Sequence, residues 1–325
     1  MSILVTGGTG FIGLNLIEAL LSAGETVVCF SSDAIPDDFR ARSTAPQQSL
    51  VGIVGDVRDG DAIADAMRRH DVTGMYPLAA VTANEQREAS DPETIWAINT
   101  QAMVTQLRAA RDCGVARIVV PSSVAVYGDA YFNSDVVDEV HTACTPSDIY
   151  GISKLAAERL ALRLAGLWKL NLSIARIGGT FGPWERITGV RDTISPFFYT
   201  AQMALAGGKA ILPSDSPSLS WCYSRDIASG LIHMFNNAPA SYVANISSGV
   251  AWGDSIAHFA GELHRKFPEF SWELSPDAAR QNIRFSDHRS KARMNISRMH
   301  AIGWRPAFPP KAAIADYVEW LGGRN

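Results

Sequence analysis

Tyr150 and Lys154 have the residue types and the spacing that acid–base chemistry needs. Residues four apart on a helix share a face, with their Cβ atoms about 5–6 Å apart. An ammonium group at that range favours the tyrosinate and lowers the phenol pKa from its usual value of about 10. A tyrosine tuned in this way can exchange a proton with a substrate hydroxyl near neutral pH. The same spacing is also that of a packed tyrosine beside a surface lysine, so the pair needs support from the rest of the chain.

Ser122 and Ser123 bring two hydroxyls to the same region. They follow the apolar run 116–121, which we expect to be a buried strand. In open parallel sheets, ligands bind outside the carboxyl ends of the strands. We therefore expect these hydroxyls to lie beside a bound ligand.

The element that must hold such a ligand opens the chain, as TGGTGFIG at residues 6–13. It follows an apolar run and leads into a stretch of helical periodicity that extends to Ala23. Gly7 permits a tight turn, Gly10 lets backbone N–H groups approach a pyrophosphate, and Gly13 lets the helix pack closely on the strand. The helix N-terminus adds about half a positive charge facing the phosphates. This order of strand, glycine turn and helix predicts a dinucleotide-binding site.

Strands and helices alternate after that turn. The sequence predicts strands at 26–30, 50–54, 75–80, 116–121 and 171–176, with helices at 59–69, 93–113 and 150–166 between them. Such alternation predicts an α/β fold of the Rossmann type, a doubly wound parallel sheet with right-handed crossovers. Beyond residue 176 the alternation loosens. Helices are expected there at 193–206 and 225–235, and a returning strand at 242–246.

The end of the second strand normally meets the adenosine ribose. An acidic residue there would bond the ribose hydroxyls and repel a 2′-phosphate. Ser31 stands at that place, and Asp33, two residues later, could reach the ribose. Equally, the serines with Arg40 or Arg42 could hold a 2′-phosphate, so the choice between NAD and NADP stays open. Asp56, just past the third strand, is expected either to accept from the adenine amino group or to cap the next helix.

The composition narrows the possible partners. Of the 325 residues, 47% are hydrophobic and 19% are charged, as in an ordinary globular protein. The formal net charge of −4 argues against a nucleic-acid partner. No apolar stretch reaches the roughly 18 residues of a membrane helix, and the start has no features of a secretory signal. The four cysteines are scattered without metal-ligand spacing and are expected to be reduced thiols. We therefore expect a cytoplasmic protein with no metal, membrane or nucleic-acid partner.

Together these stretches resemble the extended short-chain dehydrogenase/reductases, and specifically the NAD-dependent epimerase/dehydratase family. The resemblance spans nearly the whole chain and rests on TGGTGFIG at 6–13, GDV at 55–57, Asn99, SSVAVYG at 122–128, YGISK at 150–154, Glu158, RIGGTFGP at 176–183, DIA at 226–228, IGW at 302–304 and Trp320. It implies an NAD(P)-binding Rossmann domain over residues 1–176, with returns around 210–247. It also implies a smaller C-terminal substrate-binding lobe, mainly residues 177–325, and a homodimer formed through helices 93–113 and 147–166.

The resemblance implies a role for each matching residue. Tyr150 would be the acid–base, Lys154 would bond the nicotinamide ribose and lower the tyrosine pKa, and Ser123 would polarise the reacting C–O group. Ser122 would be the structural neighbour of Ser123, and Asn99 an anchoring member of the catalytic set. The cofactor contacts expected on this basis are Gly7, Gly10, Phe11, Ile12, Gly13, Ser31, Asp56, Val57, Ala79, Tyr150 and Lys154.

The substrate is less well defined by the sequence. Loop 184–192 carries Arg186 and Arg191, which are expected to bind an anionic or sugar substrate, although they could equally form surface ion pairs. Nucleotide-sugar enzymes of this kind usually carry an arginine at the place of Leu219. Arg225 or Arg191 could take the role of that arginine. Val124 follows Ser123, where a dehydratase normally needs an acidic residue.

The resulting prediction is an NAD(P)-dependent oxidoreductase or epimerase that transfers a hydride at a carbinol carbon of a sugar, sugar acid or similar substrate. The first alternative is a nucleotide-sugar 4-epimerase or dehydratase that recycles its cofactor. The second is a cofactor-binding sensor without chemistry, which would have no need of the serine, tyrosine and lysine.

Overall fold

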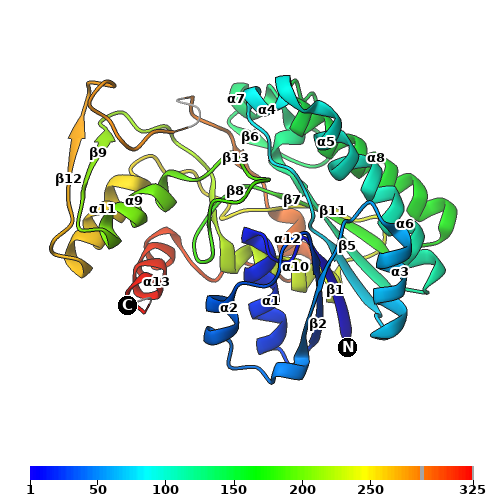
Figure 1. Cartoon of the computed structure of the whole chain (residues 1–325). Helices are drawn as coiled ribbons and strands as arrows, with labels where there is room; N and C mark the ends of the chain where they lie inside the picture. Colours follow the sequence, from blue (N-terminus) through cyan, green and yellow to red (C-terminus); the bar gives the residue numbers. More distant parts are fainter. Residues whose placement is uncertain (286–288, 324–325) are drawn as a thin grey trace.

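Seven parallel strands form the central sheet of the protein, in the order β11-β7-β5-β4-β1-β2-β3 (Figure 1). We describe the fold from a computed structural model, which covers residues 1–285 and 289–323. The strands are β1 Ser2–Thr6, β2 Thr26–Ser31, β3 Leu50–Val54, β4 Gly74–Pro77, β5 Arg117–Ser123, β7 Leu172–Ile177 and β11 Val243–Ile246. The chain runs outward from β1 to β3 and then returns to the other side of β1, so the strand order reverses between β1 and β4. The predicted Rossmann-type α/β fold is confirmed.

Helices cover both faces of this sheet. Helices α3 (Gly60–Arg69), α6 (Ala102–Asp112) and α8 (Ile149–Trp168) cover one face, and α1 (Phe11–Ser22) and α10 (Ser224–Asn237) cover the other (Figure 1). Successive side chains of a strand point to opposite faces, so a strand buried on both sides is apolar throughout. In β1, Ile3 and Val5 accordingly pack in the core with α1, while Leu4 packs in the core with α3 and α6.

The expected helix over 93–113 is interrupted. The structure instead has α5 (Pro92–Trp96), a π-helical turn (Ala97–Gln101) and α6. The turn carries Asn99, whose buried side chain is bonded to neighbouring segments. Such one-turn π-bulges re-aim side chains within a helix, and nothing in the local periodicity predicts them.

The remaining elements connect the sheet or build a second, smaller body. Short helices are α2 Asp37–Arg42, α4 Glu85–Ser90, α7 Ala130–Asn133 and α12 Ser297–Ala301, with 3-10 turns at Gln47–Ser49 and Val124–Tyr127. The smaller body contains α9 Pro196–Leu205, α11 Ser255–Lys266 and α13 Pro310–Gly322 beside the paired strands β9 Lys209–Pro213 and β12 Ser271–Ser275 (Figure 1). Two further strand pairs join distant segments, β8 Gly179–Phe181 with β10 Trp221–Tyr223, and β6 Val136–Val137 with β13 Arg293–Met294.

Residues from the second half of the chain complete the central sheet. Strand β11 pairs with β7, as expected for residues 242–246, whereas β9 lies outside the sheet and pairs with β12. Arg117, which begins β5, is buried beneath α10. Its guanidinium donates to the carbonyl oxygens of Met234, Phe235 and Ala238 at the end of that helix, at 2.8–3.0 Å. These acceptors are the carbonyl groups that a helix C-terminus leaves unpaired.

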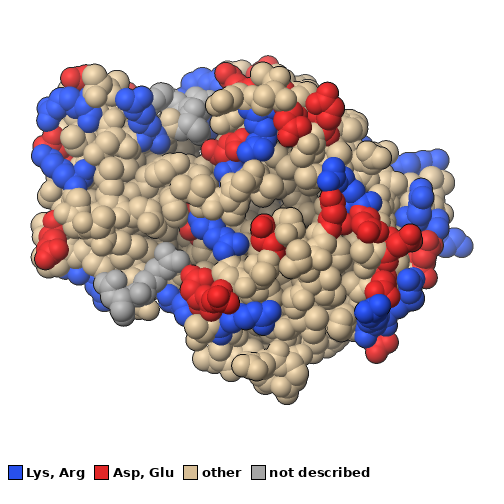
Figure 2. Space-filling view, viewed as in Figure 1, with Lys and Arg blue, Asp and Glu red and all other residues tan. Residues whose placement is uncertain are grey.

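The surface carries charges of both signs. On the face drawn in Figure 2, acidic and basic side chains are interspersed. Across the described residues, none of the helices combines the length and the apolar character needed to span a bilayer. The same residues contain no cluster of three or more His, Cys, Asp or Glu side chains that could hold a metal ion.

Candidate active site

A cavity of about 760 Å³ lies at the carboxyl ends of the central strands, where the strand order reverses. This is the position at which doubly wound sheets bind their ligands. The cavity is lined by the glycine turn, the loops after β2, β3, β4 and β5, the start of α8, and loops of the smaller body. Every cofactor, catalytic and substrate residue predicted from the sequence lines it, except Asn99.

The glycine turn forms the floor of the cavity. Gly7 has a φ of +63°, and a Cβ there would lie 2.6 Å from the Cα of Ala79. A Cβ at Gly13 would lie 2.6 Å from the carbonyl oxygen of Gly8, so α1 packs directly on the turn. Gly10 is the N-cap of α1 and offers no side-chain acceptor to the first N–H groups of the helix. Those groups are therefore available to an anion, which is the fit that a dinucleotide pyrophosphate requires.

Tyr150 is brought to Ser123 by the packing of α8 against the end of β5. The first turn of α8 is capped by Asp148, whose carboxylate accepts from the N–H of Gly151 at 2.6 Å. Burial raises the pKa of Tyr150, and hydrogen bonds with Ser123 and Thr82 oppose that rise. The pKa is therefore raised rather than lowered as predicted, because burial of the phenol outweighs the groups that favour the tyrosinate.

Lys154 is bonded to the backbone rather than to the tyrosine. Its Nζ donates to the carbonyl oxygen of Pro121, near the end of β5, at 2.7 Å. Burial lowers the pKa of Lys154 to about 8, and the negative charge of Glu158 opposes that fall. The ammonium group thus lies in the cavity wall, one helical turn from Tyr150.

These features together suit a dinucleotide-dependent enzyme, and comparison with known proteins gives the family. Residues 3–247 match the NAD dependent epimerase/dehydratase family. The chain belongs to this family. Family membership confirms the predicted enzyme class, an NAD(P)-dependent enzyme of the epimerase/dehydratase type, and with it the predicted NAD(P) cofactor.

Individual relatives are distant but extend over the full chain. The sequence is 25% identical to the low-salt glycan biosynthesis protein Agl12 of Haloferax volcanii and 25% identical to a putative UDP-glucose 4-epimerase of Methanocaldococcus jannaschii, with 99% of both chains covered in each case. Among solved structures, a UDP-glucose 4-epimerase from Stenotrophomonas maltophila with bound NAD and formylated UDP-arabinopyranose gives a TM-score of 0.81 at 22% identity, covering 100% of this chain and 98% of that one. A UDP-glucose 4-epimerase from Thermotoga maritima with UDP-glucose gives 0.78 at 18% identity, covering 100% and 99%.

A buried ion pair lies behind the serine pair at the end of β5 in this epimerase/dehydratase family member. Glu158 accepts from Arg176 Nη2 at 2.6 Å and Nε at 3.1 Å, and both side chains are almost fully buried. The same carboxylate accepts from the hydroxyl of Ser122 at 3.1 Å. Ser122 therefore faces the protein interior, and Ser123 faces the tyrosine.

Asn99 lies outside the cavity and acts as an anchor. Its Oδ1 accepts from the N–H of Val81 at 2.8 Å, and its Nδ2 donates to the carbonyl oxygen of Val81 at 2.9 Å and to Ser153 Oγ at 3.0 Å. The side chain thereby ties the loop after β4 to α8. This arrangement agrees with the expected anchoring role of Asn99. Asn99 does not line the cavity, so its expected place among the catalytic residues has no contact in the structure to support it.

The loop after β2 bears on the two alternatives left open for the adenosine ribose. Ser31 is buried, and its hydroxyl is bonded to Thr9 Oγ at 2.7 Å, so it is already engaged. Asp33 lines the cavity and accepts from Ser32 Oγ at 3.0 Å.

Arg40 and Arg42 are both absent from the described lining of the cavity. The guanidinium of Arg42 lies 4.7 Å from the ring centroid of Trp320 and 5.5 Å from that of Trp184. The positions of these arginines give no support to a 2′-phosphate site built from them.

Asp56 lines the cavity beside Arg58. Its Oδ1 accepts from the backbone N–H and the Nε of Arg58, both at 2.9 Å, and these bonds lower the pKa of Asp56. The following helix, α3, is capped instead by Asp59, which accepts from the N–H of Ala62 at 3.0 Å. Asp56 is therefore not the cap of α3, and its contact with adenine stays a prediction.

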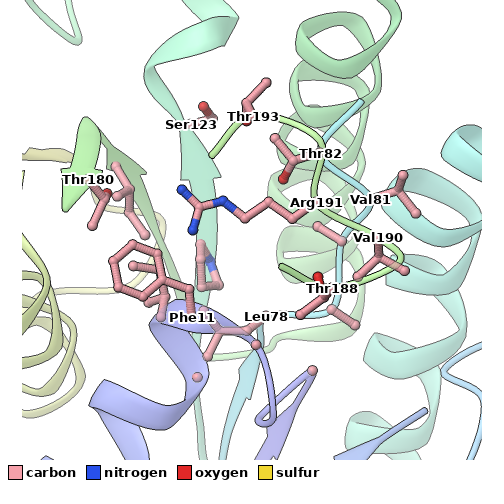
Figure 3. A pocket seen from close by; sticks show the side chains of 18 of the residues that line it. Phe11, Leu78, Val81, Thr82, Ser123, Thr180, Thr188, Val190, Arg191 and Thr193 are labelled. Atoms are coloured by element: carbon pink, nitrogen blue, oxygen red, sulfur yellow. The ribbon is translucent and has the colours of Figure 1, made fainter. Parts of the chain in front are cut away.

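The structure places Arg186 and Arg191 over the glycine turn. Arg186 Nη2 donates to the carbonyl oxygen of Thr9 at 2.6 Å, and the guanidinium of Arg191 lies 4.7 Å from the ring centroid of Phe11. Figure 3 shows the Arg191 side chain reaching into the cavity above Phe11, toward Ser123. Both arginines thus lie beside the expected phosphates.

The substrate side of the cavity includes residues that sequence reasoning missed. Thr82 follows β4, so the rule that ligands bind at the carboxyl ends of strands could have found it. Thr180, Trp221 and Phe285 come from the second half of the chain. Thr180 lies in the RIGGTFGP stretch at 176–183, which could have indicated it, whereas Trp221 and Phe285 lie in none of the stretches that carry the resemblance. At the place of the expected diphosphate arginine, the buried side chain of Leu219 lines the cavity.

Proposed function

We propose that the protein catalyses hydride transfer at a hydroxyl-bearing carbon of a sugar or sugar-like substrate, with Ser123, Tyr150 and Lys154 as the catalytic group. The observation that carries the proposal is that Ser123, Tyr150 and Lys154 line the same cavity as the glycine turn. Ser123 and Thr82 are also the groups whose hydrogen bonds lower the pKa of Tyr150 against the effect of burial. A nicotinamide cofactor bound in that cavity supplies the hydride acceptor. The glycine turn would hold its phosphates, Asp33 its adenosine ribose, and Lys154 its nicotinamide ribose.

In this mechanism Tyr150 takes the proton of the substrate hydroxyl as the carbon is oxidised, and Ser123 donates a hydrogen bond to the same oxygen. Tyr150 accepts a proton only if its pKa falls when the complex forms. Lys154 lies one turn away on the same helix, and moving its ammonium group from Pro121 toward the ribose would supply the positive charge that favours the tyrosinate.

The experiment that tests this mechanism is the Tyr150→Phe substitution. Turnover should fall by about 100- to 10,000-fold, which is the range that general acid–base catalysis contributes. NADH affinity, measured by the quenching of tryptophan fluorescence, should stay within about twofold, because the ring and its packing are retained. Turnover at the unsubstituted rate would refute the role of Tyr150.

We further propose that the cofactor is NAD rather than NADP. The carboxylate of Asp33 lies at the adenosine end, and a 2′-phosphate beside it would be repelled. NADH should therefore bind about tenfold or more tightly than NADPH, and Asp33→Ser should reduce that ratio. Equal affinities for the two cofactors would contradict this assignment.

A nucleotide-sugar 4-epimerase is the second candidate function, and the names of the full-length relatives favour it. Against it, Leu219 offers no charge to a diphosphate, and Arg225 is paired with Asp316 at 2.7 Å. Incubation with UDP-glucose, sugar acids and polyols, followed by product analysis and absorbance at 340 nm, separates the two. Isomerised product without net NADH identifies an epimerase, whereas accumulating NADH identifies a dehydrogenase.

We also propose a homodimer formed through α5 and α8. Large apolar side chains are exposed on these helices: Trp96, Ile152, Leu160 and Leu167 are 39–55% exposed. Burying such side chains is a common driving force for association. Light scattering should give twice the chain mass, and Leu160→Glu should give a monomer; a monomeric unsubstituted protein would contradict the proposal.

The assignment of cofactor and substrate binding to two parts of the chain, and the cellular compartment of the protein, are likewise proposals. Residues 1–176 with the returning α10 and β11 would bind the cofactor, and residues 177–325 would mainly form the substrate lobe. The cytoplasm is the proposed compartment, since Cys29, Cys113, Cys144 and Cys222 are all free thiols. Cell fractionation tests this placement.

A further inference from the structure

The segment 184–193, which we call the phosphate strap, crosses the cavity and is fastened to the loop after β4. The N–H of Thr82 donates to the carbonyl oxygen of Val190, and the N–H of Asp192 donates to the carbonyl oxygen of Thr82, both at 2.9 Å. The side chain of Arg87, on α4, holds both carboxylate oxygens of Asp192 at 2.7 Å. This bidentate pair is largely shielded from solvent, with side-chain exposures of 27% and 14%. Such geometry makes it stronger than an ordinary surface ion pair.

The other end of the phosphate strap is fixed by a buried carboxylate. Glu185 accepts from the N–H of Ser195 at 2.9 Å and pairs with Arg191 Nη2 at 2.9 Å, and its side chain has no exposed surface. A carboxylate without solvent contact needs such partners, because an unpaired charge at that depth would be costly. The ion pair with Glu185 therefore holds the Arg191 side chain in position in the cavity.

Each guanidinium group of the phosphate strap has a buried nitrogen whose hydrogen-bonding capacity the described residues do not use. Arg186 Nε and Arg191 Nη1 are buried and lack a hydrogen-bond partner within the described part of the chain. Arg186 is already bonded to Thr9 in the glycine turn, and Arg191 lies over the ring of Phe11 at the start of α1. In Figure 3 the Arg191 guanidinium points into the open part of the cavity. Buried donors without partners, placed at a helix N-terminus, are the arrangement that an anionic ligand completes.

We propose that the phosphate strap closes over the pyrophosphate of the bound dinucleotide, opposite the glycine turn, and that the pair formed by Arg87 and Asp192 sets how fast the cofactor leaves. The proposal rests on the proposed function in taking a dinucleotide to bind in this cavity. A substrate diphosphate would offer the same chemistry. The contacts of both arginines to residues of the glycine turn favour the cofactor as the source.

The proposal has a kinetic consequence. The strap can lift from the loop after β4 only when the Arg87 pair, the two backbone bonds of Thr82, and the bonds from Arg87 to Gly189 and from Asn84 to Asp192 have opened. Changes within one binding site act mainly on dissociation rates. A fastened strap therefore favours a cofactor that stays bound through many turnovers.

The main test measures the dissociation rate of bound NADH by stopped-flow chase with excess NAD. Arg87→Met and Asp192→Asn should each raise that rate about tenfold or more, with association changed by less than about threefold. The control is Arg69→Met, which removes an exposed pair with Asp65 on α3 and should leave both rates unchanged. An unchanged dissociation rate in both strap variants would overturn the proposal, whatever their thermal stability.

A second test identifies the anion. Arg186→Gln should weaken NADH binding about tenfold or more and reduce its dependence on salt, since one charge facing the pyrophosphate is lost. Binding of UDP, measured by calorimetry, should be unchanged. Weakened UDP binding with unchanged NADH binding would assign the arginine to the substrate and overturn the proposal. Failure of the unsubstituted protein to bind NADH at all would instead refute the proposed function.

Discussion

Replacing Glu158 with glutamine tests how much the buried ion pair between Glu158 and Arg176 stabilises the fold. Glutamine has nearly the same shape and can still accept from the hydroxyl of Ser122, so the change removes mainly a negative charge. Arg176, whose side chain is 3% exposed, would then be a buried cation without its carboxylate. Removing one partner of such a pair typically costs about 3–5 kcal/mol. This is a large part of the roughly 5–15 kcal/mol by which a folded protein is stabilised.

The assay is urea unfolding followed by circular dichroism at neutral pH. Glu158→Gln should lower the free energy of unfolding by about 3–5 kcal/mol, whereas Glu273→Gln, which alters an exposed pair with Lys209, should change it little. The double variant Glu158→Leu/Arg176→Met should recover much of the loss, because apolar residues of similar size can replace a buried pair. A Glu158→Gln variant within about 1 kcal/mol of the unsubstituted protein would refute the argument.

Three further predictions concern the site itself. Burial lowers the pKa of Lys154 to about 8, so NADH affinity should fall as the pH rises above that value. The free energy of unfolding should rise between this pKa and the higher pKa of the lysine in the unfolded chain, because the unfolded chain binds more protons in that range. Lys154→Met should lack both changes, and an NADH affinity that stays constant from pH 7 to 9.5 would contradict the first. Thr82→Val removes a hydrogen bond that opposes the raised pKa of Tyr150, so the acid limb of the kcat/KM profile should move to higher pH, and an unmoved limb would count against this contact. Gly13→Ala places a Cβ 2.6 Å from the backbone of the glycine turn and should weaken NADH binding about tenfold or more in a fluorescence titration, whereas Gly166→Ala, in open space on α8, should not.

The sequence predicted the parts of this site that local patterns determine. A glycine turn, a serine pair after a strand, and a tyrosine four residues before a lysine are short motifs whose positions follow once the strands are parallel and adjacent. The interruption of the helix at Asn99 was not predictable, because it depends on bonds to Val81 and Ser153 from segments far away in the sequence. Tertiary contacts of this kind override periodicity.

The two strap arginines mark the limit of sequence reasoning. Their charge and their loop predicted an anion, but a substrate was the expected partner. Only the fold shows Arg186 bonded to Thr9 and Arg191 above Phe11. Similarly, the pKa of Tyr150 follows from its burial, which spacing along a helix does not report. Charge and spacing limit the chemistry, while packing decides which groups face each other.

The position of Arg117 beneath the end of α10 has a consequence for folding during synthesis. A growing chain that has reached residue 177 contains the glycine turn and Tyr150, yet β7 still presents an unpaired edge. Arg117 then has Asn171 and Ser173 as partners but lacks the three carbonyl groups at the end of α10. An exposed strand edge and a buried charge with only part of its hydrogen bonds both disfavour a stable intermediate. The cofactor half therefore becomes complete only after β11 has been synthesised, so a fragment cut at residue 177 should aggregate rather than bind NADH. The boundary proposed at residue 176 between cofactor and substrate binding is therefore not expected to be a boundary for folding.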